Sequence, residues 1–205
     1  MTRRLTIVRH GNTFAPGETP RRIGARTDLP LVESGRAQAR ALGDWFRADA
    51  RHFDRVLASP LQRTRETATL ILMCQPAPPP VENCAWLGEI DHGPDEGRPE
   101  DAVIARIGAG CLEAWDRNAA PPPGWIVDAR ARIAGWQALF ASPSPETGET
   151  LLVTSNGAAR FAFLADAGLR SAASRLSSLK LRTGAWGTII VEESSVRLEA
   201  WDQRP

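Results

Sequence analysis

The feature that most constrains the fold is a short apolar run, residues 5–8 (LTIV), which ends abruptly in Arg9, His10 and Gly11. Such a run, bounded by charge and glycine, is typical of a buried strand in an α/β sheet. The carboxyl ends of these strands open onto ligand crevices, and glycine lets the backbone turn there. An arginine fork binds phosphate, and imidazole is a competent nucleophile near neutral pH. On its own the triplet would more often mark a solvated strand end, so the hypothesis of a reactive histidine depends on the rest of the chain.

The order of the remaining segments predicts an α/β fold, a three-layer α/β/α sandwich around a mostly parallel, mixed sheet. We expect strands near 4–9, 54–58, 150–155, 185–192 and 195–201, and helices near 34–50, 62–73, 100–117, 126–141 and 157–167. Because only Glu193 and Ser194 separate the last two strands, these should form a C-terminal antiparallel hairpin. A length of 205 residues would allow one or two domains. We predict a single domain, residues 1–205, with a helical insertion at about 98–142.

Charge and cysteine content narrow the classes of partner. A formal net charge of +1 gives no support for binding to nucleic acid or to a membrane surface. The basic start of the chain is followed by too few apolar residues for a signal peptide or a membrane span. Cys74, Cys84 and Cys111 are odd in number and show no pairing pattern, so we expect partly buried thiols in a cytoplasmic protein. These features leave the oligomeric state open.

Four blocks of sequence carry reactive side chains at fixed spacing, and three of the blocks also contain glycines. They are residues 9–13 (RHGNT), 24–39 (GARTDLPLVESGRAQA), 59–68 (SPLQRTRETA) and 87–98 (LGEIDHGPDEGR). Together they resemble the histidine phosphatase superfamily, the group that contains phosphoglycerate mutases and many phosphomonoesterases. The resemblance extends over most of the chain. It implies the α/β fold expected above and an enzyme that transfers a phosphoryl group.

The resemblance assigns a role to five residues in these blocks. It makes His10 the nucleophile and Arg9 and Arg63 the two phosphate-binding arginines, with Asn12 as a further donor. It makes Glu89 the general acid, whose pKa must be raised by burial or by a nearby phosphate dianion before the carboxyl can donate a proton. From residue type alone, Arg63 would as often be a helix-surface side chain and Glu89 would more often be an exposed loop carboxylate. The spacing of the glycines that follow Glu89 favours the acid.

Three further positions have expected structural roles. Val32 occupies the place of the family's helix-capping threonine, so Glu33 or Ser34 must cap the helix that follows. Glu96 is expected to order its own loop. Arg65 is expected to be solvated, because it points away from Arg63's side of the helix.

A fifth block departs from the family pattern. After the strand at 150–155 the family continues with serine, histidine and glycine, whereas this chain has Ser155, Asn156 and Gly157. Asn156 therefore stands where the second pocket histidine is expected. An amide keeps a hydrogen bond donor but cannot carry charge. Removing such a donor costs roughly 3–4 kcal/mol, or on the order of 10²–10³ in rate, and replacing it with another donor should cost less.

The chain has only two other histidines. His52 lies at the polar end of the first long helix and is expected to be solvated. His92, three residues after Glu89, could supply some of the lost charge, although a histidine beside a Gly-Pro turn is more often exposed. With three scattered histidines and no C-x-x-C pair, the sequence gives little support for a metal site, and the scheme implied by the resemblance needs no cofactor.

Seven tryptophans occur in a chain without tyrosine. Four of them fall in amphipathic segments and are expected in the core: Trp45, Trp115, Trp136 and Trp201. The other three lie near loops and are the candidates for lining a pocket: Trp86, Trp125 and Trp186.

These observations favour a metal-independent phosphomonoester hydrolase that forms a phosphohistidine on His10 and acts on a small phosphorylated substrate, with activity impaired or specialised by Asn156. One alternative is a non-catalytic phosphoryl-binding protein, in which Asn156 marks lost chemistry. The other is a phosphoglycerate mutase, which is less favoured because residues 98–125 contain few basic side chains. Substrate specificity would come from the loops at 14–27 and 90–125.

Overall fold

Six strands form one mixed sheet in the computed structural model, which describes residues 2–142 and 148–205. In spatial order the strands are β3 (Val81–Asn83), β2 (Arg55–Ala58), β4 (Glu149–Thr154), β1 (Arg3–Arg9), β5 (Trp186–Val191) and β6 (Val196–Gln203). The first four run parallel, whereas β5 is antiparallel to β1, and β6 is antiparallel to β5. The mostly parallel sheet and its C-terminal antiparallel hairpin are confirmed.

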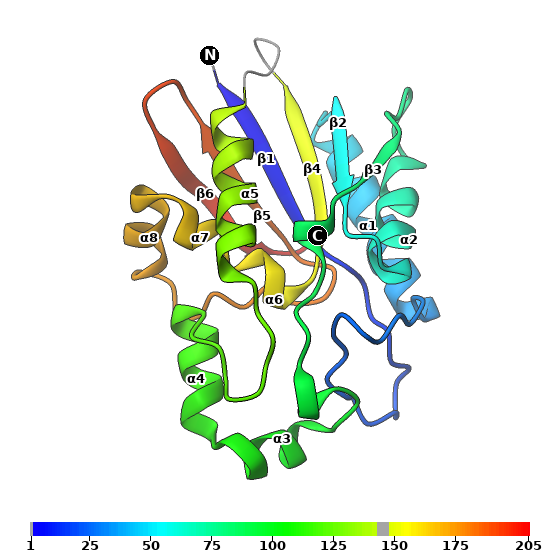
Figure 1. Ribbon diagram of the computed structural model, residues 1–205. Helices are drawn as coiled ribbons and strands as arrows, with labels where there is room; N and C mark the ends of the chain where they lie inside the picture. The colour runs from blue at the N-terminus through cyan, green and yellow to red at the C-terminus, as the bar shows by residue number, and fades with distance from the viewer. Residues whose placement is uncertain (1, 143–147) are drawn as a thin grey trace.

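Helices cover both faces of this sheet, as Figure 1 shows. One face carries α1 (Glu33–Ala48) and α2 (Gln62–Leu72). The other carries α5 (Ala129–Ala141), α7 (Ala162–Ala165) and α8 (Ala167–Ala173). The three layers that the sequence predicts are therefore present.

The remaining elements gather at the carboxyl ends of the parallel strands (Figure 1). The short helix α6 (Asn156–Ala159) follows β4 directly, and α3 (Glu100–Ile107) and α4 (Ala109–Asn118) lie beyond the sheet. Two 3₁₀ turns, η1 (Ala85–Leu87) and η2 (Gly93–Asp95), shape the chain between β3 and α3. The long loop after β1 reaches the same end of the sheet, which concentrates irregular backbone where α/β proteins bind ligands.

A hydrophobic core lies on each face because successive strand side chains point to opposite sides. In β1, Ile7 packs in the cluster that contains side chains of α5, α7 and α8, whereas Val8 packs with α1 and α2. In β4, Leu152 and Val153 divide in the same way. All four are fully buried, and full burial of such a side chain contributes about 1.5–3 kcal/mol. Burial on both faces explains why these strands are continuously apolar.

Several helix boundaries differ from the sequence prediction. The helix expected at 100–117 is broken by Gly108, which has a φ of +82° and separates α3 from α4. The helix expected at 157–167 is divided into α6 and α7, and α8 begins after the extended Asp166, whose carboxylate accepts a hydrogen bond from Leu169 N at 3.0 Å. β3 was not predicted, since it is only three residues long and largely exposed.

The expected cap of α1 is wrong. The helix begins at Glu33 with Val32 at the N-cap position, and no side chain there makes a capping hydrogen bond. Ser34 instead uses its hydroxyl to accept a hydrogen bond from Asn12 Nδ2 at 3.3 Å. The side chain that could have capped the helix is thus directed toward the loop after β1.

Two other expectations concern the whole chain. The three cysteines are free thiols, with Cys84 buried and Cys74 and Cys111 half-buried, as expected. Across the described ranges, no helix has both the length and the apolar character needed to cross a membrane.

Candidate active site

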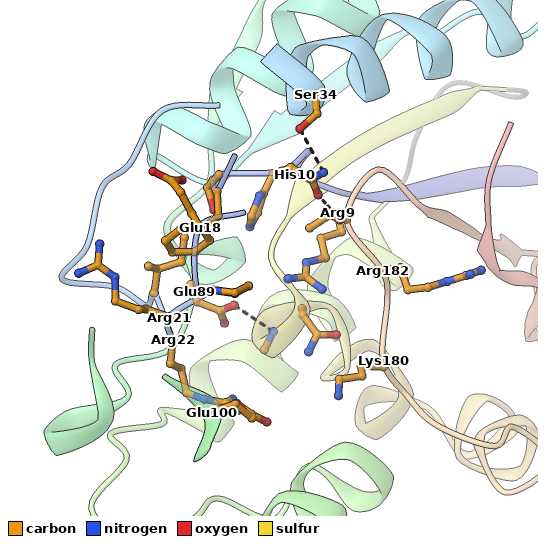
Figure 2. Close-up of a pocket in the computed structure, with 18 of the residues that line it drawn as sticks. Arg9, His10, Glu18, Arg21, Arg22, Ser34, Glu89, Glu100, Lys180 and Arg182 are labelled. Atoms are coloured by element: carbon orange, nitrogen blue, oxygen red, sulfur yellow. Dashed lines mark hydrogen bonds and ion pairs between the residues drawn. The ribbon is translucent and has the colours of Figure 1, made fainter. Parts of the chain in front are cut away.

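A cavity of about 700 Å³ opens at the carboxyl ends of β1 and β4. Five of the six predicted site residues line it: Arg9, His10, Asn12, Glu89 and Asn156. Figure 2 shows Arg9, His10 and Glu89 around a common space, while Arg21 and Arg182 extend outward at its edges. Residues far apart in the sequence are therefore brought together, as the motifs predict.

His10 is held in one orientation and one protonation state. The ring is buried, and its Nδ1 lies 2.8 Å from the carbonyl oxygen of Gly11. Because a carbonyl can only accept a hydrogen bond, Nδ1 carries the proton and Nε2 keeps a free lone pair. Burial lowers the pKa of His10 well below its usual value, and the charges of Arg9 and Arg63 lower it further. The ring is therefore neutral at neutral pH, and its free Nε2 is chemically able to act as a nucleophile.

Two glycines hold the His10 turn against the start of α1. A Cβ built on Gly11 would lie 2.8 Å from the carbonyl carbon of Gly35, closer than real Cβ atoms come. The amide of Gly11 also donates to the hydroxyl of Thr67 at 3.2 Å, and this hydroxyl donates to the backbone oxygen of Arg63 at 2.7 Å. Three of the sequence blocks thus meet at one turn, which explains their glycines and threonine.

Arg9 presents a cation to the cavity. Its Nη1 donates to the carbonyl of Leu181 at 2.8 Å, while its Nε is buried without a hydrogen bond partner. Burial lowers the pKa of Arg9 to about 10 against the opposing charge of Glu89, so the guanidinium remains charged at neutral pH. A fixed cation beside His10 is suited to hold an anionic group in front of the ring.

Arg63 is fully buried and does not belong to the cavity lining. Its Nη1 donates to the carbonyl of Thr27 at 2.6 Å and its Nη2 to that of Gly24 at 3.2 Å. Arg63 is thus neither a helix-surface side chain nor, in this structure, an exposed phosphate ligand. Its positive charge nevertheless interacts with His10 and Glu89 and lowers the pKa of both side chains. Arg65, by contrast, is exposed, as expected.

Glu89 is a buried carboxylate that two backbone amides hold in place. Its Oε1 accepts from Ile90 N at 2.9 Å and its Oε2 from Gly157 N at 3.2 Å. Burial raises the pKa of Glu89, but the charges of His92 and Arg63 and the two amides outweigh burial, so the pKa is lowered. Burial therefore does not keep this carboxyl protonated. Of the two expected causes, only the charge of a bound phosphate dianion remains.

Arg132 of α5 holds the loop that carries Glu89, a role that the sequence did not reveal. Its guanidinium donates to three carbonyls of this segment: Nη1 reaches that of Trp86 at 3.0 Å and that of Gly88 at 2.5 Å, and Nη2 reaches that of Glu89 at 3.4 Å. Gly135 of the same helix packs directly on the indole of Trp86. The only sequence signal for this arrangement is an arginine and a glycine on one face of a helix.

Glu96 orders the second part of the same loop, as predicted. Its carboxylate accepts from Gly24 N at 2.8 Å, from the hydroxyl of Thr27 at 2.7 Å and from His92 N at 3.2 Å. Burial raises the pKa of Glu96, but contacts with these three residues lower it to about 2. Glu96 therefore ties the loop at 24–27 to the loop that carries Glu89 and His92.

Asn156 is the first residue of α6 and faces the cavity. Its Oδ1 accepts from Leu181 N at 2.9 Å, which leaves the NH₂ group as the part of the amide that can serve a ligand. Asn12 is held at both ends of its amide, since Oδ1 accepts from Thr183 Oγ1 at 2.6 Å and Nδ2 donates to Ser34. Each asparagine can offer a further N–H to a bound anion.

The expectation that His92 is exposed is wrong. The residue is 4% exposed and lines the cavity, and its ring packs edge-on against Trp125 with centroids 4.6 Å apart. His52 is exposed, as predicted. Trp115 lines the cavity in addition to packing in the core, whereas Trp125 is buried outside the lining. Sequence spacing could not show that the segment around Trp125 folds back over His92.

Basic side chains surround the mouth of the cavity. They come from three separate segments: Arg21, Arg22, Lys180, Arg182 and Arg204. Several have carboxylate partners; Lys180 Nζ lies 3.0 Å from Asp116 Oδ2, and Arg22 pairs with Glu100. Within residues 2–142 and 148–205, no group of three histidine, cysteine or acidic side chains is placed to hold a metal ion.

Comparison with known proteins bears on this arrangement. The model of a family described as "Histidine phosphatase superfamily (branch 1)" matches residues 5–204. The 2,3-bisphosphoglycerate-dependent phosphoglycerate mutase of Methylobacterium sp. (strain 4-46) is 33% identical over 162 residues, which are 77% of this chain and 76% of that protein. The protein of the same name from Bartonella quintana (strain Toulouse) is 31% identical over 190 residues, 90% of each chain.

Solved structures agree on the fold. The α-ribazole phosphatase from Shigella flexneri superposes with a TM-score of 0.73 at 24% identity, covering 98% of this chain and 96% of that one. A mycobacterial glucosyl-3-phosphoglycerate phosphatase superposes with a TM-score of 0.76 at 20% identity, covering 98% and 99%. At this level of identity the likeness bears on the fold alone.

Proposed function

Because the chain belongs to the histidine phosphatase superfamily, we propose that it is a phosphomonoester hydrolase. The proposed enzyme needs no metal, forms a phosphohistidine on His10 and acts on a small phosphorylated metabolite. The observation that carries the proposal is the state of His10. A buried, neutral imidazole with a free Nε2 faces the same cavity as Glu89 and Arg9. This arrangement combines a nucleophile, a proton carrier and a fixed cation.

In the first half-reaction, Nε2 of His10 attacks the phosphorus of the monoester. A nitrogen–phosphorus bond forms as the bond to the leaving oxygen breaks, and Glu89 gives its proton to that oxygen. Glu89 must first be protonated, and the dianionic phosphoryl group favours this by raising the pKa of the nearby carboxyl. Arg9 holds the equatorial oxygens and neutralises their charge, and the buried charge of Arg63 supports it from outside the lining.

In the second half-reaction, the ionised Glu89 takes a proton from a water molecule, whose oxygen attacks the phosphorus. The nitrogen–phosphorus bond breaks, inorganic phosphate leaves, and His10 returns to its neutral state with the proton still on Nδ1. Glu89 is then protonated and ready for another cycle, so one carboxyl serves both steps. The hydrogen bond from Nδ1 to the carbonyl of Gly11 fixes the ring throughout.

Asn156 takes the place of a second pocket histidine in this scheme. Its NH₂ group donates a hydrogen bond to the phosphoryl group but carries no charge. Asn12, which also faces the cavity, adds a further neutral donor. Activity should therefore be reduced relative to a site with a charged donor, and not abolished.

Two alternatives make different predictions. The relatives named phosphoglycerate mutase favour transfer of the phosphoryl group to an acceptor other than water. If the missing charge at Asn156 abolished catalysis, the protein would bind phosphoryl groups without turning them over. The mutase predicts transfer to a phosphoglycerate acceptor in competition with hydrolysis, and the binding protein predicts phosphate affinity alone.

The test is hydrolysis of p-nitrophenyl phosphate in the presence of a chelator by the purified protein and by its His10→Ala variant. Turnover by the parent that vanishes in the variant is the expected result. Equal rates, with inorganic phosphate bound by both proteins, would refute the proposal in favour of a binding role.

A further inference from the structure

We propose that His92 is a further catalytic residue, which gives the transferred phosphoryl group the charged hydrogen bond donor that Asn156 cannot provide; this inference rests on the phosphatase function proposed above. His92 and Asn156 line the same cavity from different segments of the chain, one after Glu89 and the other after β4. An imidazolium donates a charge-assisted hydrogen bond, which is roughly twice as strong as a neutral one.

The surroundings of His92 hold its ring in one defined orientation. Its Nδ1 is buried, has no hydrogen bond partner within bonding distance, and lies 3.6 Å from Glu96 Oε2. The Glu96 carboxylate is therefore placed to pair with an imidazolium at this position. Because Nδ1 faces Glu96, Nε2 is the nitrogen left for a ligand. Glu96 stays ionised at neutral pH, since its pKa is lowered to about 2.

Close packing fixes the ring of His92. It packs edge-on against Trp125, with the two rings at 77°. A Cβ built on Gly24 would lie only 2.6 Å from its Nδ1, so the loop at 24–27 comes as near to the ring as a glycine allows. A donor that is held by its neighbours before substrate arrives stabilises charge in the transition state without reorganisation.

The other charged groups around His92 are committed to different partners. Asp95 accepts a hydrogen bond from Trp125 Nε1 at 2.7 Å and is also paired with Arg106. The guanidinium of Arg22 lies 5.0 Å from the centre of the Trp125 ring. Glu89 and Glu96 are the carboxylates that His92 itself influences, since its charge lowers the pKa of Glu89. His92 thus adds one imidazole on the Glu89 side of the cavity.

The decisive experiment is a double-mutant cycle between His92→Asn and Asn156→His, with kcat for p-nitrophenyl phosphate as the readout. If His92 supplies the missing charge, His92→Asn should lower kcat about 10²-fold in the parent protein. The loss should be less than about 5-fold in the Asn156→His background, where a second histidine takes over. Both backgrounds lose the same packing against Trp125, so a purely structural role predicts equal losses. Equal losses, or no loss in the parent, would overturn the inference.

Two controls separate this inference from the proposed function. His52→Asn, which changes the exposed histidine, should leave kcat unchanged. If the smaller side chain of His92→Asn prevents folding, His92→Phe takes its place in the cycle. The dissociation constant for inorganic phosphate is measured for the same four proteins. If the parent is no more active than His10→Ala, the phosphatase function is wrong, yet phosphate affinity still tests His92. A weakening confined to the Asn156 background supports the donor role, and equal affinities contradict it.

Discussion

Replacing Gly157 with alanine should displace Glu89, slow catalysis and lower the free energy of unfolding. A Cβ at this position would overlap Oε1 of Glu89 and lie 3.0 Å from its Cδ and 3.2 Å from Cγ1 of Ile90. Ordinary contacts begin near 3.4 Å, so the carboxylate must move away. The move breaks the hydrogen bonds that Gly157 N and Ile90 N make to it.

The loss of stability can be worked out from the contacts. Two lost hydrogen bonds to a buried carboxylate cost roughly 1.5–3 kcal/mol each, while alanine in place of a helical glycine returns about 0.5–1 kcal/mol. The free energy of unfolding should thus fall by about 2–5 kcal/mol. A displacement of roughly 1 Å at a reacting group, however, can cost on the order of 10² in rate. We expect kcat for p-nitrophenyl phosphate to fall about 10²-fold.

The matched control is Gly110→Ala in α4, where an added Cβ meets no atom within 4 Å. This variant should gain about 0.5–1 kcal/mol in stability and keep its kcat. Both variants are assayed for hydrolysis and for urea unfolding. Full kcat in Gly157→Ala would show that the position of Glu89 does not limit the reaction, and the assigned role would be wrong.

Three further predictions follow from the supporting residues. Glu96→Gln should destabilise the protein by about 3 kcal/mol near neutral pH, because the pKa of Glu96 falls from 4.5 to about 2 on folding. In urea unfolding, the difference in stability between parent and variant should shrink as the pH falls from 4.5 toward 2. A difference that stays constant with pH would refute this prediction. Arg132→Met should lower kcat at least about 10-fold, because the loop that carries Glu89 loses the hydrogen bonds that hold it. Arg130→Met, at an exposed position of the same helix, should leave kcat unchanged. The pKa of His10 is lowered well below 6.5, so kcat/KM, corrected for substrate ionisation, should stay constant as the pH falls through 6.5 and decline only well below it. A decline centred at pH 6.5 would show that burial does not lower the pKa of His10.

The sheet and most of the site were predictable because their signals are local. The apolar runs of β1 and β4 are buried on both faces, which makes them continuous in sequence. Gly11 and Gly157 stand where backbone or carboxylate approaches too closely for a side chain. Five of the six residues assigned from the motifs face one cavity, because the motifs lie at or near the ends of strands that open onto it.

What the sequence did not reveal depends on contacts between distant segments. His92 is buried because Gly24, from a segment before it, and Trp125, from a segment after it, pack on its ring. Arg132 reaches the Glu89 loop across more than forty positions, with hydrogen bonds to carbonyls that have no sequence signature. The sign of the pKa shift at Glu89 depends on a balance between burial and its neighbours, and residue type cannot settle that balance.

We propose that the phosphoryl group passes through Nε2 of His10, in a site where Asn156 stands in place of a charged donor. This route is tested most directly by mixing the protein with p-nitrophenyl phosphate, quenching in base, and locating any covalent phosphoryl group by mass spectrometry of the peptides. We predict one phosphoryl group on His10 that is stable in base, labile in acid and absent from His10→Ala. Steady hydrolysis with no phosphoryl group on His10, or with one on another residue, would contradict the account.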